Sequence, residues 1–150
     1  MDTFMTYLEN PNSANSTFHN ITASLLLSRI NACIKGYETT LRSLAIYGFS
    51  LEELTKIDNF AAWDLAQGGH VSKLAAAEGF VDKTTAWEYM LTAGENAYRS
   101  YTSWRQFLGA YFIGWGMMDN KVNIADFRDT IQYLLKNPKS PYHKLPLKSS

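Results

Sequence analysis

Apolar residues recur along this chain at intervals of three and four, and no run shows the two-residue alternation typical of a half-buried β-strand. One helical stretch spans residues 21–34 and the next spans residues 37–47. Between them lies Gly36, and the pattern leaves open whether this glycine separates two helices or bends one. With the segments that follow, we expect an all-α fold, a single-domain globular bundle of about six or seven helices.

Short start and stop signals divide the rest of the chain. Ser50 and Ser103 each stand three residues before a Glu or Gln, which is the pattern of a capping box. Asp82 and Asn123 are placed as N-caps, and Gly79 is placed to end a helix. These signals predict helices over residues 50–58, 60–78, 83–99, 104–118 and 124–136.

Large aromatic side chains fall on the apolar stripes of the helices between residues 60 and 118. On the helix over residues 83–99 the expected inward stripe is Trp87, Met90, Leu91, Gly94, Tyr98 and Tyr101. Together the stripes predict one aromatic-rich core made of Trp63, Trp87, Trp104, Phe107, Tyr111 and Trp115. Because glycine lets a neighbouring helix approach closely, we expect a central helix around Gly109, Gly114 and Gly116.

Polar, turn-rich residues flank the helical region. We expect residues 1–20 to form a polar N-terminal arm that is partly ordered. Residues 21–136 are expected to form a single all-α domain, which agrees with a chain length of 150 residues. Residues 137–150 are rich in Pro and Lys and are expected to lie on the surface as a tail or to be disordered.

The composition narrows the classes of function. The chain is 46% hydrophobic and 19% charged, and 14 basic residues balance 14 acidic ones. This balance argues against a nucleic-acid partner, which would favour a basic excess, and it gives no attraction to an anionic membrane surface. The most apolar run, residues 107–118, is too short to cross a bilayer, and the N-terminus lacks the features of a secretory signal. We therefore expect a soluble, cytoplasmic protein.

No set of residues forms a recognisable catalytic, cofactor-binding or metal-binding signature. The histidines His19, His70 and His143 are widely separated, and none stands at a metal-ligand spacing from Cys, Asp or Glu. We expect His70 to be a hydrogen-bonded structural histidine near a packed face, with a ligand or general base as the alternative. Cys33, the only cysteine, is expected to be a buried inert thiol, with a reactive thiol as the alternative.

Four acidic residues are candidates for a functional role. Asp64 lies in the first turns of a predicted helix, where the helix dipole favours a carboxylate, and its alternative role is a partner-facing or proton-transfer acid. Glu78, Asp82 and Glu88 crowd the turn around Gly79. Their default interpretation is a solvated acidic corner, and the sharper alternative is a contact surface for a cationic partner. We take these three residues as the candidate partner-binding residues.

An ordered set of short motifs covers residues 40–118. These are Tyr47-Gly48-Phe49-Ser50 with Glu52-Glu53, Ala62-Trp63-Asp64-Leu65, Glu78-Gly79-Phe80, Ala86-Trp87-Glu88, Tyr101-Thr102-Ser103-Trp104, Phe107, Gly109, Tyr111 and Gly114. In this combination the segment resembles the bacterial domain-of-unknown-function family DUF1266. The family usually has an arginine shortly after the tryptophan–aspartate pair, where this chain has Ala66-Gln67-Gly68. If that arginine pairs with the aspartate in relatives, Asp64 needs another partner, and Arg99 and Arg105 are the candidates.

The resemblance carries no established enzymatic activity. Members look like small bacterial proteins, some encoded near secreted or contact-delivered toxins, so the resemblance implies a non-catalytic immunity protein that binds and blocks a cognate toxin. The neutral net charge counts mildly against this role, because inhibitors of basic nucleases tend to be acidic. The alternatives are an accessory or scaffold protein and, least favoured, a small hydrolase using Asp64 and His70. We expect no cofactor and no metal, and the oligomeric state stays open.

Overall fold

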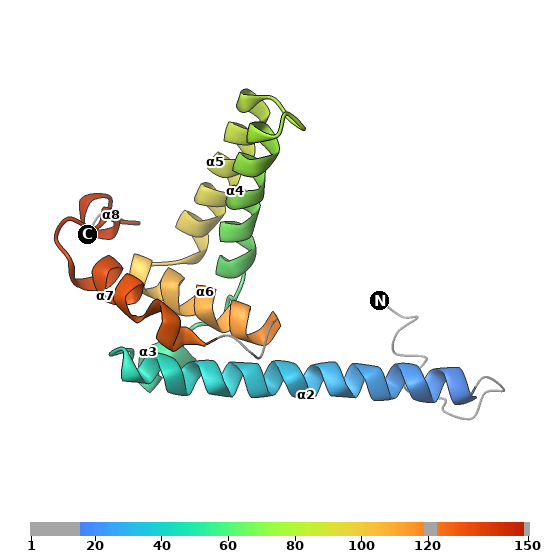
Figure 1. Cartoon of the computed structure of the whole chain (residues 1–150). Helices are drawn as coiled ribbons and strands as arrows, with labels where there is room; N and C mark the ends of the chain where they lie inside the picture. The colour runs from blue at the N-terminus through green and yellow to red at the C-terminus, as the bar shows by residue number, and fades with distance from the viewer. Residues whose placement is uncertain (1–15, 119–122, 149–150) are drawn as a thin grey trace.

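Figure 1 shows the computed structural model of the chain, which describes residues 16–118 and 123–148, with side chains from residue 22 onward. Its elements are α2 (Ser16–Ile46), α3 (Leu51–Thr55), α4 (Ala62–Ala77), α5 (Lys83–Ser100), α6 (Trp104–Met118), the 3-10 helix η1 (Ile124–Phe127), α7 (Arg128–Lys136) and α8 (Pro141–Lys144). Every element in the described ranges is helical, which confirms the all-α prediction.

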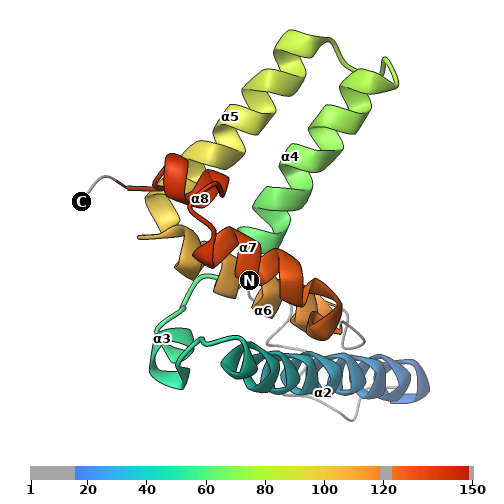
Figure 2. The same ribbon diagram turned by 60° about the vertical axis from the view of Figure 1, so that its left-hand side comes forward.

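The central element is α6, as predicted. It lies along one half of α2 and also packs against α3 and the base of α4 (Figures 1 and 2). Its sequence is apolar on every side, which suits a helix that is covered all round. Leu108, Ala110, Phe112 and Ile113 are all buried, and they join Leu44 of α2 in the core.

Glycines let α2 and the segment between α3 and α4 approach α6 closely at three places. A Cβ atom on Gly116 would overlap the Thr40 hydroxyl of α2, and one on Gly36 would overlap the Gly116 carbonyl. A Cβ on Gly114 would lie 2.6 Å from the Phe60 carbonyl oxygen, and one on Gly109 would lie 3.0 Å from Ile57 Cδ1. Gly36 therefore neither ends nor divides the first helix. The helix α2 continues through Gly36, and the missing side chain makes room for α6.

The predicted capping boxes differ in outcome. At the start of α3, Ser50 Oγ accepts from the Glu53 N–H at 3.1 Å and the Glu53 carboxylate accepts from the Ser50 N–H, so this box is complete. At the start of α6, Ser103 Oγ accepts from the Gln106 N–H at 3.1 Å. Gln106 Oε1, however, accepts from the Thr102 N–H and hydroxyl, at 2.7 and 2.9 Å. The second prediction is therefore half correct, because Thr102 offers two donors to the glutamine.

The prediction of one core with six aromatic residues is wrong at Trp87, which is 58% exposed. The other five form two clusters. Trp63 stacks on Trp115 with ring centroids 4.9 Å apart, and Tyr111 contacts both rings. Trp104 and Phe107 meet edge-to-face at 5.7 Å at the other end of α6. Trp87 is separate because its helix projects away from α6.

Residues 137–148 lie on the surface of the body, which is the first of the two alternatives for the tail. Tyr142 of α8 stacks on Trp104 at 4.7 Å between ring centroids. Ser140 is fully buried, and its hydroxyl donates to the Leu134 carbonyl oxygen at 2.8 Å. Of the predicted N-terminal arm, residues 1–15 lie outside the described part, and residues 16–20 belong to α2.

Candidate partner-binding surface

The helices α4 and α5 form an antiparallel hairpin that projects from the body (Figure 2). The inner face of α5 carries Ala86, Met90, Ala93 and Ala97, which are buried or half-buried. The outer face carries Trp87, Leu91 and Tyr98, with exposed fractions of 58%, 48% and 54%. These three residues recur at helical spacing, and we call them the outer stripe. The predicted inward stripe of this helix was therefore wrong for them, although Tyr101 at its end is buried.

Small residues explain why α5 turns its alanines inward. One face of α4 carries Leu65, Gly68, Ser72 and Ala75, and α5 lies against this face. Alanines facing small residues allow two helices to lie close together, whereas a tryptophan would hold them apart. A hollow of about 240 Å³ remains between them, lined by Gly68 and Ser72 on one side and Tyr89 on the other.

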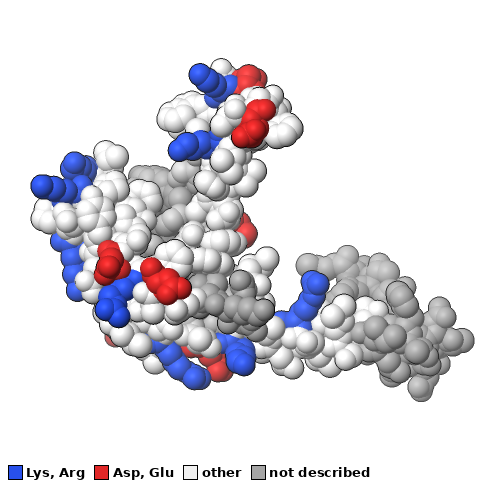
Figure 3. Space-filling view, viewed as in Figure 1, with Lys and Arg blue, Asp and Glu red and all other residues white. Residues whose placement is uncertain are grey.

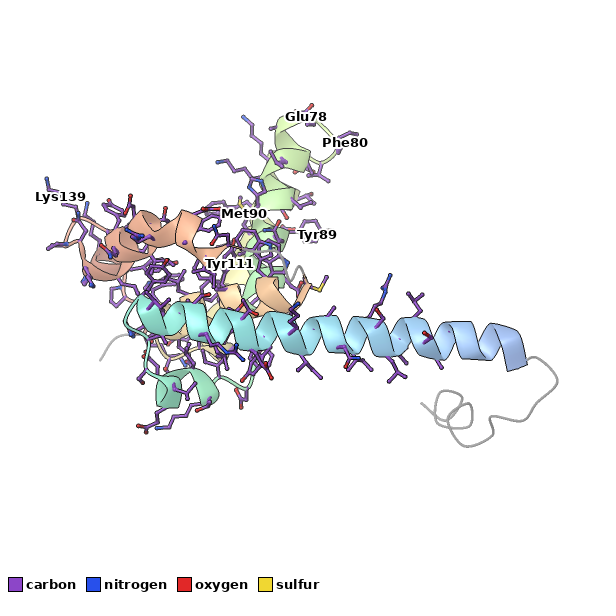
Figure 4. All side chains as sticks on the ribbon, turned by 60° about the horizontal axis from the view of Figure 1, so that its bottom comes forward. Glu78, Phe80, Tyr89, Met90, Tyr111 and Lys139 are labelled. Carbon is purple, nitrogen blue, oxygen red and sulfur yellow. The ribbon has the colours of Figure 1, made fainter. Side chains whose placement is uncertain are left out.

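The tip of the hairpin exposes a further aromatic side chain. Gly79 has φ 77°, a left-handed conformation that ends α4 and turns the chain. Phe80 follows it and is 82% exposed, the highest value among the large apolar residues of the described chain. Figure 4 shows Phe80 and Glu78 together at this tip, both directed away from the body.

The three candidate acidic residues lie in this region, and all are exposed. Asp82 has a structural role, because its carboxylate accepts from the Thr85 N–H at 2.9 Å and from the Thr85 hydroxyl at 2.8 Å. The backbone hydrogen bond from Thr85 lowers the pKa of Asp82 below its usual value. Lys73 and Lys83 are exposed in the same region, so the tip carries both signs of charge (Figure 3). The apolar side chains therefore distinguish this surface better than its charge does.

Asp64 and His70 do not come together. They lie six residues apart on α4, and both are exposed. Six residues correspond to about 240° of rotation, which places the two side chains on different faces of the helix. The predicted hydrogen bond of His70 on a packed face is wrong, because no hydrogen bond to His70 occurs within the described residues. This placement gives no support to a hydrolase that uses the two residues together.

The arginines considered as partners for Asp64 bind other acids. Arg99 lies 3.5 Å from Glu95 on the same helix. Arg105 uses Nε and a terminal nitrogen to bind the Glu53 carboxylate, donates to the Gly48 carbonyl, and lies 4.3 Å above the Phe49 ring. The suggestion that one of them replaces the missing arginine is therefore wrong. Arg105 instead links α6 to α3, and no sequence motif predicted this contact between residues far apart in the chain.

Two further polar side chains, those of Cys33 and Tyr101, have structural partners. Cys33 is half-buried, and its Sγ donates to the Met117 carbonyl oxygen at 3.1 Å. The Tyr101 hydroxyl donates to the Asn59 carbonyl oxygen at 3.1 Å, and burial raises the pKa of Tyr101. Among the side chains of residues 22–118 and 123–148, no group of three His, Cys, Asp or Glu is placed to hold a metal ion. None of the helices described is long and apolar enough to span a membrane.

The sequence matches the family described as "Protein of unknown function (DUF1266)" over residues 6–147. The match extends beyond the segment of residues 40–118 that suggested the family, and it includes α2 and the C-terminal helices. Comparison with curated proteins and with solved structures found no match. What the surface of this molecule does must therefore be argued from the surface itself.

Proposed function

The chain belongs to the DUF1266 family, whose function is unknown, and we propose that this member is an immunity protein: a non-catalytic protein that binds and blocks a cognate interbacterial toxin. A protein of this kind needs a stable scaffold and an exposed surface for one protein partner. The body around α6 supplies the scaffold, and the α4–α5 hairpin supplies the surface.

The observation that carries the proposal is the outer stripe of α5. Trp87 and Tyr98 are more than half exposed although they lie on an apolar stripe of α5. Tryptophan and tyrosine are enriched at the centres of protein interfaces, because their rings contribute large contact areas with few rotatable bonds. An exposed stripe of this composition is typical of a binding surface rather than of an unused surface.

The acidic residues fit the rim of such an interface. Glu78 lies at the tip, and Glu88 follows Trp87 directly on α5. Charged groups at a rim accelerate association and select the partner more than they strengthen binding. We therefore assign the affinity to the outer stripe, and we assign orientation towards a cationic toxin surface to Glu78 and Glu88.

The proposal is tested by expressing the chain together with the toxin-like product of an adjacent open reading frame. The immunity role predicts that coexpression restores growth, and that the two purified proteins form a stable complex. A complex without protection would favour the alternative, an accessory or scaffold protein. If the chain neither binds that product nor protects cells against it, the proposal is contradicted.

The contribution of the acidic rim is tested separately. The double variant Glu78→Lys with Glu88→Lys reverses two exposed charges and leaves the core unchanged. We expect it to remain folded and to associate more slowly with the toxin, with the effect shrinking as salt is added. Full protection and an unchanged association rate would show that these acids are only a solvated surface.

A further inference from the structure

A pocket of about 320 Å³ lies where the C-terminal segment, residues 137–148, crosses the junction of α5 and α6 (Figure 2). Its walls come from the start of α6, from α7 and from the C-terminal segment: residues 102–105, 134–135, 142–143 and 146–148. Two contacts fix the segment there, the stack of Tyr142 on Trp104 and the bond from the Trp104 indole N–H to the Leu145 carbonyl oxygen. The volume is near the lower limit for small-molecule sites in proteins.

The charge of this region differs from that of the whole chain. The chain carries 14 basic and 14 acidic residues, whereas residues 130–148 contain four lysines and His143 and no acidic residue. The pocket has the same bias, because Arg105, His143 and Lys148 line it and no Asp or Glu of the described residues does. A local excess of positive charge favours an anionic ligand.

Lys148 is a cation of this pocket whose charge is not balanced. The two oxygens of Glu53 accept from Arg105, so the charge of this arginine is already matched. Lys148 forms no ion pair with any described side chain, and its Nζ lies 5.5 Å from the centre of the Tyr98 ring. It is also half-buried. An ammonium with reduced hydration gains more from a nearby anion than one in open solvent.

The pocket also offers a second donor and an apolar wall. Ser103 Oγ accepts from the Gln106 N–H, and its own hydroxyl proton has no acceptor among the described residues. An ammonium and a hydroxyl that both need an acceptor suit a carboxylate, which only accepts hydrogen bonds. The side chains of Trp104, Leu134 and Leu147, all half-buried, supply apolar surface in the same pocket.

We propose that this pocket binds a small carboxylic acid in its ionised form, with an apolar or aromatic body. The carboxylate accepts from the Lys148 ammonium and the Ser103 hydroxyl, and the body lies against Trp104 and the leucines. One unmatched ammonium balances the single charge of a carboxylate. A phosphate carries more charge and favours the fork of an arginine, but Glu53 already occupies that of Arg105. This binding does not depend on the proposed toxin partner, so it is tested without one.

The test follows Trp104 in two-dimensional NMR spectra of the full chain, because its indole N–H gives a resonance of its own at the pocket. Trp104→Phe identifies this resonance. The probe is 3-phenylpropionate, and the control ligand is 3-phenylpropionamide, which has the same body without the charge. We expect the acid to shift the Trp104 resonance saturably, with a dissociation constant below about 1 mM, and the amide to bind at least about tenfold more weakly.

Two lysine variants then locate the charge. Lys148→Gln should weaken binding of the acid at least about tenfold. Lys139→Gln is the matched control and should change the affinity by less than about twofold, because Lys139 is an exposed lysine of the same segment that does not line the pocket. Unfolding curves verify that both variants stay folded. The proposal is overturned if Trp104 shows no saturable shift, if acid and amide bind equally, or if the two substitutions have equal effects.

Discussion

The body around α6 and the α4–α5 hairpin use the same residue types in opposite ways. In the body, aromatic rings face one another, as where Trp104 stacks on Tyr142, and glycines lie at helix crossings, as where Gly36 meets Gly116. In the hairpin, alanines face inward, and Trp87 faces solvent. The comparison shows that the residues of the facing helix decide whether an aromatic stripe is buried or exposed.

The largest expected effect comes from adding one methyl group at a glycine of the body. In Gly36→Ala the new Cβ would collide with the Gly116 backbone carbonyl, so α2 and α6 must move apart. We expect a loss of about 3 kcal/mol in the free energy of unfolding, measured by denaturant titration.

The matched control in the hairpin is Gly94→Ala. Nothing lies within 4 Å of a Cβ at Gly94, so alanine should only improve helix propensity and stabilise the protein by up to about 1 kcal/mol. Opposite signs at the two glycines would support the comparison. A loss at Gly94 similar to that at Gly36 would show that the hairpin is as tightly enclosed as the body.

The second prediction compares two tryptophans. Trp104 stacks on Tyr142, meets Phe107 edge-to-face, and donates its indole N–H to the Leu145 carbonyl. Trp104→Ala should therefore cost about 3 kcal/mol in the free energy of unfolding and release the C-terminal residues from the body. Trp87→Ala should change stability by no more than about 0.5 kcal/mol, since the side chain lies largely in solvent. Equal losses would remove the distinction between body and hairpin.

A smaller effect is expected at the link between α3 and α6. Arg105→Ala removes a bidentate contact with Glu53, a hydrogen bond to Gly48 and a contact with the Phe49 ring. Because both charged side chains are about one-third exposed, we expect a loss of about 1–2 kcal/mol in thermal or denaturant unfolding. Arg105→Lys keeps the charge but not the forked geometry, and it should recover less than half of the loss. Full recovery would mean that charge alone stabilises this contact.

The smallest expected effect is a pH dependence in the hairpin. The Thr85 N–H lowers the pKa of Asp82 in the folded state, so the ionised cap stabilises the fold above the unfolded pKa of about 4. This contribution is lost as the pH falls through the lower, folded pKa. Asp82→Asn retains a capping oxygen without titrating there, so the stability of wild type relative to this variant should decline in acid. A difference that stays constant with pH would contradict the assigned cap.

Local signals in the sequence predicted most of the fold. The Ser50 capping box, the Asp82 cap and the close packing at Gly109, Gly114 and Gly116 were all correct, because each depends on neighbouring residues or on one geometric requirement. Whether an apolar stripe faces the core or the solvent depends on the helix that packs against it. The periodicity of one helix does not identify that neighbour. Trp87 was therefore placed in the core, although the adjacent Ala86 is the residue that packs inward.

The candidate partner-binding surface was also anticipated only in part. Glu78, Asp82 and Glu88 were selected because acidic residues cluster around the turn at Gly79, and these residues do lie on one exposed region of the hairpin. The outer stripe was missed because its residues look like core residues when the fold is unknown. The ion pair between Arg105 and Glu53 was missed because the partners are 52 residues apart in sequence.

The most direct test of the account is the affinity of the double variant Trp87→Ala with Tyr98→Ala for the toxin identified by coexpression, measured by calorimetry beside its unfolding curve. The account predicts an unfolding midpoint close to that of wild type and an affinity at least about 100-fold weaker, a loss of about 2.7 kcal/mol. A variant that loses stability while keeping wild-type affinity would contradict it, because the outer stripe would then belong to the fold and not to the partner.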